Sequence, residues 1–169
     1  MVVKFLRENV IASALLLLVR LYLGYEWITA SYHKFADGFD ASGFLKGALA
    51  GATGDHPSVQ GWWGAFLEHF ALPNAHLFST LIPIGEFLVG LGLILGCLTT
   101  AAAFFAAVMN FSFLFSGTVS TNGQMVLLTI FILVAGANAG RFGLDYYVIP
   151  FIRKQFGKDK AAGRDPVRS

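Results

Sequence analysis

Four apolar stretches, each long enough to cross a lipid bilayer as a helix, constrain this sequence more than any other feature. A hydrocarbon core about 30 Å thick takes roughly 20 helical residues at 1.5 Å per residue. The stretches cover residues 10–33, 76–97, 99–117 and 123–140. Only 13 % of the 169 residues are charged, too few to cover the surface of a water-soluble domain. The sequence therefore predicts an all-α fold, a four-helix transmembrane bundle in contact with the lipid bilayer.

The first stretch follows two basic residues, as a signal peptide would. It is too long for the apolar region of a signal peptide, and Arg20 lies inside it. We therefore interpret it as the first span.

The distribution of lysine and arginine predicts the orientation, because cytoplasmic loops carry an excess of these residues. The segment between the first two spans, residues 34–75, has only Lys34 and Lys46. The ends of the chain are richer in basic residues: Lys4, Arg7, Arg141, Arg153, Lys154, Lys158, Lys160, Arg164 and Arg168. We expect residues 1–150 to form the bundle, with both termini in the cytoplasm and residues 151–169 as a basic cytoplasmic tail.

The outer loop at residues 34–75 is expected to be folded. Asp40 is placed to cap a short helix that runs to about Ala50. A second helix is indicated by aromatic and aliphatic residues at helical spacing, and Pro73 would end it. The residues that carry this pattern are Trp62, Trp63, Phe66, Leu67 and Phe70. We predict two short amphipathic helices on the outer surface of the bundle.

The segment Tyr146–Phe156 is predicted to be an interfacial helix on the cytoplasmic side. Tyr146 and Tyr147 would be its aromatic anchors. Pro150 would break or kink it. The last dozen residues are expected to be disordered.

Polar residues inside the spans are the first candidates for a functional site, because charges in the membrane are costly. Counting from the span midpoints places Arg20 and Glu86 at the bilayer centre, with Asn110 at about the same level. We expect an Arg20–Glu86 ion pair with Asn110 hydrogen-bonded nearby. Such a pair could fix the register of the helices, or Arg20 could face a cavity and bind an anionic or carbonyl group of a ligand. Both interpretations remain open.

A second set of polar residues lies nearer the outer face. Glu26 and His33 share one face of the first span. Other polar residues of similar depth are Ser79, Thr80, Ser116, Asn122 and Gln124. Together these groups could line an outward-opening polar pocket roofed by the aromatic loop, or they could simply be hydrated at the interface.

Metal and cofactor motifs are lacking in this sequence. The four histidines, His33, His56, His69 and His76, show no spacing typical of a ligand pair. Cys97 is the single cysteine, so the chain has no dithiol. We expect no metal, haem or flavin site. With a net charge of only +2, nothing indicates a nucleic-acid partner.

Four motifs resemble those of the DoxX family, which includes the DoxD-like small subunits of thiosulfate:quinone oxidoreductase. The motifs are R-x-x-x-G at Arg20–Gly24 with H-K-F at His33–Phe35, E-x-x-x-G-x-G-L-x-L-G-x-x-T at Glu86–Thr99, N-F-x-F-L-x-x-G-T-x-S-T-N at Asn110–Asn122, and G-x-x-G-L-D-x-x-x-x-P at Gly140–Pro150. The resemblance implies a multi-pass protein of a prokaryotic cell membrane, with a role as the membrane subunit of an oxidoreductase that passes electrons to quinone.

Three functional hypotheses remain. The first is a quinone-linked redox subunit in which Arg20, Glu86 and Asn110 orient or protonate the quinone head group. The second is a non-catalytic membrane anchor or scaffold for a soluble or membrane-attached oxidoreductase. The third is a small-solute transporter, which the absence of an inverted repeat disfavours. Homo-oligomerisation is compatible with all three.

Overall fold

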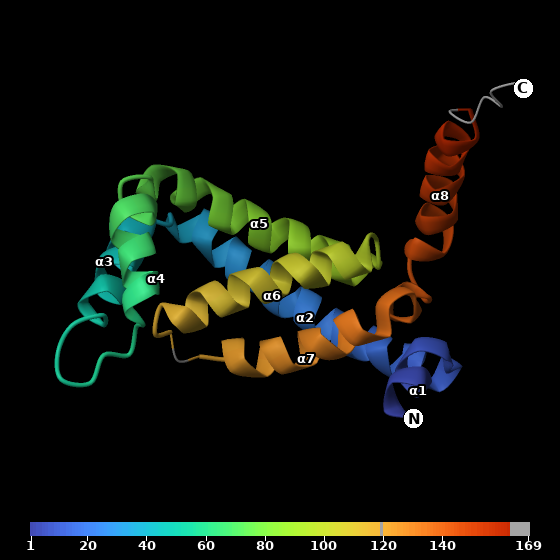
Figure 1. Cartoon of the computed structure of the whole chain (residues 1–169), viewed down its shortest axis with the longest axis horizontal. Coiled ribbons are helices and arrows are strands. Elements are labelled where there is room, and N and C mark those ends of the chain that lie inside the picture. Colours follow the sequence, from blue (N-terminus) through green and yellow to red (C-terminus); the bar gives the residue numbers. More distant parts are fainter. Residues whose placement is uncertain (119, 163–169) are drawn as a thin grey trace, which may run out of the picture.

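The computed structural model describes residues 1–118 and 120–162, and these residues form a helical bundle (Figure 1). Side chains are described up to Gln155. The helices in chain order are α1 (Val2–Glu8), α2 (Val10–Asp37), α3 (Ala41–Ala50), α4 (Gly61–Phe66), η1 (Leu67–Ala71, a π-helix), α5 (Ala75–Leu95), α6 (Thr99–Phe115), α7 (Asn122–Ala135), η2 (Gly136–Gly140, a 3₁₀ helix) and α8 (Asp145–Ala162).

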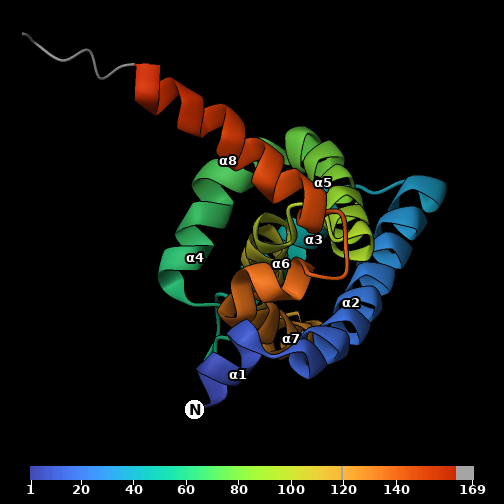
Figure 2. The ribbon, with the colours of Figure 1, turned by 90° about the vertical axis from the view of Figure 1, so that its right-hand side faces the viewer.

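Four long helices, α2, α5, α6 and α7, lie side by side around a common axis (Figures 1 and 2). Three apolar segments, Val10–Asp37, Ala75–Leu95 and Asn122–Gly140, are long enough to cross a membrane. The fourth, Thr99–Phe115, has 17 residues and would span about 26 Å. The predicted fold class, an all-α four-helix transmembrane bundle with short helices in the outer loop, is confirmed.

The bundle core is mostly apolar, with small residues where helices approach closely. The face of α6 that packs against the other helices consists mostly of alanine, at Ala102, Ala103 and Ala106. A Cβ atom on Gly90 of α5 would lie 2.9 Å from the backbone nitrogen of Ile28 in α2. One on Gly24 of α2 would lie 3.0 Å from the carbonyl oxygen of Gly90. The backbones of α2 and α5 therefore touch, as small residues permit in membrane helices.

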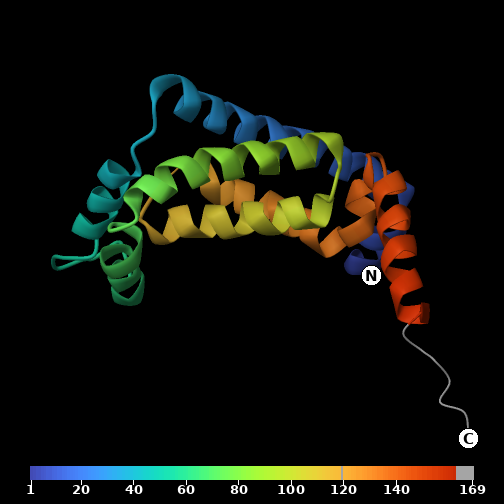
Figure 3. The ribbon, with the colours of Figure 1, turned by 90° about the horizontal axis from the view of Figure 1, so that it is seen from above.

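The outer end of the bundle, where α2 ends and α5 begins, is covered by α3, α4 and η1 (Figure 3). Asp40 caps α3 as predicted, because its carboxylate accepts a 2.9 Å hydrogen bond from the backbone N–H of Ser42. Hydrogen bonds from the hydroxyl and backbone of Ser42 lower the pKa of the Asp40 carboxyl. The second outer helix is also present, with a π-helical last turn that ends before Pro73.

The inner end, where α5 turns into α6 and where α7 ends, carries α1, η2 and α8. Figures 1 and 3 show that α8 runs across the direction of the four long helices. Of the break or kink predicted at Pro150, the break is not present, because α8 runs through that residue as one helix. It continues to Ala162, so the expected disorder does not begin at residue 158. Residues 163–169, with Arg164 and Arg168 of the predicted tail, lie outside the described residues.

Candidate functional site

The predicted Arg20–Glu86 ion pair is wrong. The guanidinium of Arg20 donates hydrogen bonds to the backbone carbonyls of Ala139, at 2.8 Å, and Phe142, at 3.0 Å. Its side chain is almost completely buried, with 1 % of its surface exposed. Arg20 therefore ties α2 to the segment between α7 and α8 at the inner end of the bundle.

The register between α2 and α5 explains this difference. A Cβ atom on Gly96 would lie 2.6 Å from Nη1 of Arg20, so Arg20 packs against the end of α5. Gly96 is ten residues further along the chain than Glu86, which corresponds to about 15 Å of helix. Midpoint counting assumes that the spans share one centre, whereas α2 has 28 residues and extends past the predicted span at its outer end.

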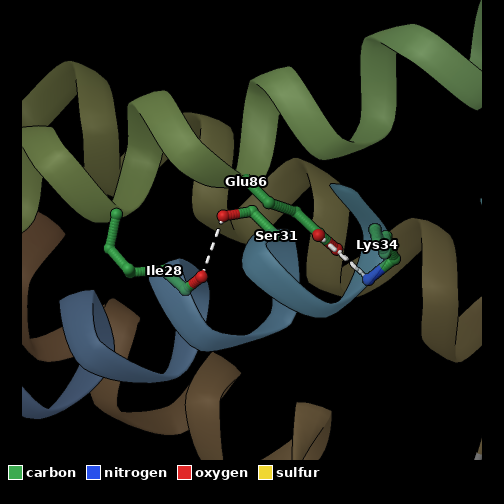
Figure 4. Close-up of polar contacts among 4 residues, drawn as sticks. All are labelled: Ile28, Ser31, Lys34 and Glu86. Atoms are coloured by element: carbon green, nitrogen blue, oxygen red, sulfur yellow. Dashed lines mark hydrogen bonds and ion pairs between the residues drawn. The ribbon is translucent and has the colours of Figure 1, made fainter. Parts of the chain in front are cut away.

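Glu86 instead forms an ion pair with Lys34. Nζ of Lys34 lies 2.9 Å from both carboxylate oxygens of Glu86. The side chain of Glu86 is 1 % exposed and that of Lys34 is 24 % exposed. The ring of Phe39 lies 5.6 Å from the same nitrogen. Figure 4 shows Lys34 reaching from the last turns of α2 to the carboxylate on α5, with Ser31 one turn away.

Asn110 lies at the level of Glu86, but the hydrogen bonds expected for its amide are not found. A Cβ atom on Gly85 would lie 3.4 Å from Sδ of Met109, so these two residues are neighbours across α5 and α6. Glu86 and Asn110 are the next residues on each helix, and both are buried. Within the described part of the chain, neither amide atom of Asn110 has a hydrogen-bond partner. A polar ligand group or a water molecule would be stabilised there, because unpaired polar atoms are costly in an apolar interior.

Asp145, the first residue of α8, closes the inner end of the bundle. Its carboxylate oxygens accept hydrogen bonds from the backbone N–H groups of Leu98, at 2.6 Å, and Thr99, at 2.9 Å. Its own N–H donates to the carbonyl of Gly96 at 2.7 Å. The carboxylate thus satisfies backbone donors at the start of α6, where a negative charge is favoured.

A groove lies between α5 and α6. It has a volume of about 650 Å³, within the range of ligand sites. Its outer part is walled by aromatic residues and its inner part by small and aliphatic ones. The residues that line it include Phe44, Trp63, Phe66, Phe78, Gly85, Leu88, Cys97, Leu98, Phe105, Met109, Ser112, Phe113 and Ser116. Leu88 and Phe105 are more than half exposed on the surface of the spans, so the groove opens toward the hydrocarbon region.

The groove is apolar and does not gather the second set of polar residues, so the outward-opening polar pocket stays a prediction. Of that set only Ser116 lines the groove, and its hydroxyl already accepts a 2.9 Å hydrogen bond from Nε1 of Trp63. The hydroxyl of Ser79 likewise accepts one from the backbone of Ala41. Glu26 and Asn122 are half-buried, and His33 and Gln124 are exposed.

Two polar residues of the structure were missed by the sequence interpretation. The first predicted span ends at residue 33, so the sequence places Lys34 in the outer loop. In a helix that continues past residue 33, the side chain of Lys34 points back toward the preceding turns, as helical side chains do. This direction is a signal that Lys34 has a partner within the membrane. The second residue is Asp145. The glycines in Gly140–Asp145 indicate that the backbone turns tightly there, but they do not indicate that Asp145 contacts α6.

No group of three potential metal ligands lies close together within residues 1–118 and 120–162. Residues 15–118 match the family model described as DoxX, which covers most of α2, the outer helices, α5 and α6. Comparisons with curated proteins and with solved structures gave no match.

Proposed function

The chain belongs to the DoxX family and is an integral membrane protein, and we propose that it is the membrane subunit of a quinone-linked oxidoreductase system. In this role it holds a long-chain quinone in the groove between α5 and α6. A partner oxidoreductase supplies the electrons, and reduction of the quinone to the quinol takes up two electrons and two protons.

The shape and chemistry of the groove carry this proposal. From Leu98 to Ser116 the groove follows about 27 Å of α6 at 1.5 Å per residue. Such a length suits an extended isoprenoid chain. Small side chains keep the inner half open, with Gly92 on α5 and Ala101 on α6. The lateral opening allows a ligand dissolved in the bilayer to enter without crossing water.

The outer end of the groove suits the flat quinone ring. The rings of Trp63 and Phe66 stack with centroids 4.9 Å apart, and Phe44 meets Phe113 edge to face at 6.0 Å. Aromatic walls of this kind bind a flat ring through stacking. Ser112, one turn before Ser116, adds a hydroxyl to the lining. The ring therefore lies at the outer end and the tail points to Cys97.

The direct test is quinone binding by the full chain in nanodiscs made from quinone-free lipid. A quinone in the groove quenches the fluorescence of Trp63, so titration with a long-chain quinone should give saturable quenching that Trp63→Phe removes. Gly85→Leu fills the groove and should weaken binding at least ten-fold. The matched control is Gly47→Leu on α3, where an added side chain meets open space. Quenching that is linear in quinone and equal in both variants would exclude the groove as the site.

A second candidate function is a non-catalytic anchor for a soluble redox partner. The exposed aromatic side chains of the outer helices favour it: Trp62 is 58 % and Phe70 52 % exposed. Trp62→Ala with Phe70→Ala should then abolish co-purification of an oxidoreductase and leave quinone binding intact. If no oxidoreductase co-purifies with the unmodified chain, this candidate is rejected.

The excess of basic residues at the inner end supports an orientation with both termini in the cytoplasm. Arg141, Arg153 and Lys154 are all exposed there. A cysteine introduced at Lys46 of α3 should react with a membrane-impermeant thiol reagent added to whole cells. A cysteine introduced at Arg153 should react only after the membrane is opened, and the reverse pattern would contradict this orientation.

A further inference from the structure

The start of α8 is fixed at the inner boundary of the spans. The N–H of Leu144 donates to the carbonyl of Leu95 at 3.0 Å, and the N–H of Asp145 donates to that of Gly96. With the two hydrogen bonds that the Asp145 carboxylate accepts, these contacts attach α8 to the turn between α5 and α6. The first turn of α8 therefore lies where the membrane-spanning part of the bundle ends.

From that point α8 runs in the plane that a bilayer surface would occupy. Figure 2, viewed along the bundle from its inner end, shows α8 crossing the end of the four long helices rather than extending one of them. Beyond its first turn α8 has few contacts with the bundle. The chain alone thus does not explain why the helix takes this direction.

The exposed side of α8 combines aromatic and basic side chains. Tyr146, Tyr147 and Phe151 are 66 %, 71 % and 68 % exposed. Arg153 and Lys154 are exposed on the same side, whereas Val148, Ile149 and Ile152 are half-covered. Tyrosine is enriched at the level of lipid headgroups, and the long stems of lysine and arginine lie along apolar surface while their charges reach phosphate.

We propose that α8 is a membrane-surface helix that binds anionic lipid headgroups of the leaflet at the inner end of the bundle. Arg153 and Lys154 contact the phosphates, and Tyr147 and Phe151 enter the boundary between headgroups and acyl chains. This surface continues the exposed apolar surface of the spans through Phe142 and Leu144, which are 47 % and 43 % exposed. The proposal does not depend on the quinone role.

The basic charge of α8 and its continuity with the exposed apolar surface of the spans favour lipid over other partners for this helix. Up to Gln155, Asp145 is the acidic residue of α8 and it is buried against α6. The exposed charges of this part of the helix are therefore those of Arg153 and Lys154. A second copy of the helix would bring like charges together. An anionic bilayer is already present beside the helix and complements its charge.

The test uses the full chain in nanodiscs with a polarity-sensitive dye on Tyr147→Cys, in a Cys97→Ala background. As phosphatidylglycerol replaces phosphatidylcholine, the dye emission should shift to the blue, and 0.5 M NaCl should reverse the shift. Each basic residue near an anionic surface contributes about five-fold to binding. Arg153→Gln with Lys154→Gln should therefore weaken the response to phosphatidylglycerol by about 25-fold.

The control is Lys46→Gln, which removes an exposed charge at the outer end and should leave the response unchanged. If the double variant does not fold, Arg153→Gln alone should give about a five-fold loss. Three results would overturn the proposal. One is a blue shift of equal size in pure phosphatidylcholine, and another is dye emission typical of water in every lipid mixture. The third is a shift that follows the number of chains per disc, which would indicate contact with a second copy.

Discussion

Nζ of Lys34 in α2 lies 2.9 Å from both carboxylate oxygens of Glu86 in α5. The pair joins the two helices whose backbones touch at Gly24 and Gly90, and it lies on the outer side of that contact. Its two members differ in burial, because Lys34 is partly exposed and Glu86 is not. This difference leads to an asymmetric prediction.

Lys34→Met should destabilise the bundle more than Glu86→Gln. Loss of Lys34 leaves a buried carboxylate without its partner, which costs about 3 kcal/mol or more. Loss of the Glu86 charge leaves an ammonium that can extend to the outer surface, so we expect about 1 kcal/mol. The measurement is the free energy of unfolding in detergent, with Lys46→Met on α3 as the control for an exposed lysine. Equal effects of the two substitutions would argue against this account of the pair.

Arg20→Met should lower the free energy of unfolding by about 3 kcal/mol, because the buried carbonyl of Ala139 and the partly buried carbonyl of Phe142 lose a charged donor. Arg20→Lys should recover only part of this loss, because an ammonium lacks the planar fork that reaches both carbonyls. Arg141→Met serves as the exposed control. Full recovery by lysine would show that charge alone, rather than the geometry of the two hydrogen bonds, is what the site requires.

Asp145→Asn should loosen the start of α6. Asparagine has an NH₂ donor group in place of one of the two acceptor oxygens, so this group would face a backbone N–H that now donates to the carboxylate. We expect faster hydrogen exchange at the amides of Leu98 and Thr99 and a loss of about 1–3 kcal/mol. The exposed Asp37→Asn should leave exchange at these amides unchanged. Unaltered protection in Asp145→Asn would mean that the carboxylate does not hold this turn.

Gly90→Ala should cost about 2 kcal/mol, because its new methyl group would lie 2.9 Å from the backbone of α2 and the helices would have to separate. Gly43→Ala on α3 meets no atom within 4 Å and should be neutral or slightly stabilising through helix propensity. Thermal unfolding of both variants tests this. A neutral Gly90→Ala would contradict the close packing of α2 and α5.

The sequence predicted the elements of this fold well. Hydropathy located the four long helices because each must satisfy its backbone within an apolar solvent. Asp40 located α3 because its capping role depends on a residue two positions away. These features are local, and a single sequence contains them.

The pairing of the polar residues could not be predicted in the same way. Arg20 and Glu86 have equal depth by counting, but their register depends on how Gly24 and Gly90 bring two backbones together. The partner of Glu86 is Lys34, which lies just beyond the predicted first span. The groove between α5 and α6 depends on how far apart these helices lie, which no pattern along one helix contains.

Photolabelling with a long-chain azidoquinone would locate quinone bound between α5 and α6. The full chain in nanodiscs is labelled, digested and mapped by mass spectrometry, with unlabelled quinone as competitor. We expect labels on groove residues such as Trp63, Phe105 and Met109 that unlabelled quinone competes away. These labels should be lost in Gly85→Leu but not in Gly47→Leu. Labels spread over lipid-facing residues such as Leu127 of α7, without competition, would contradict quinone binding in the groove.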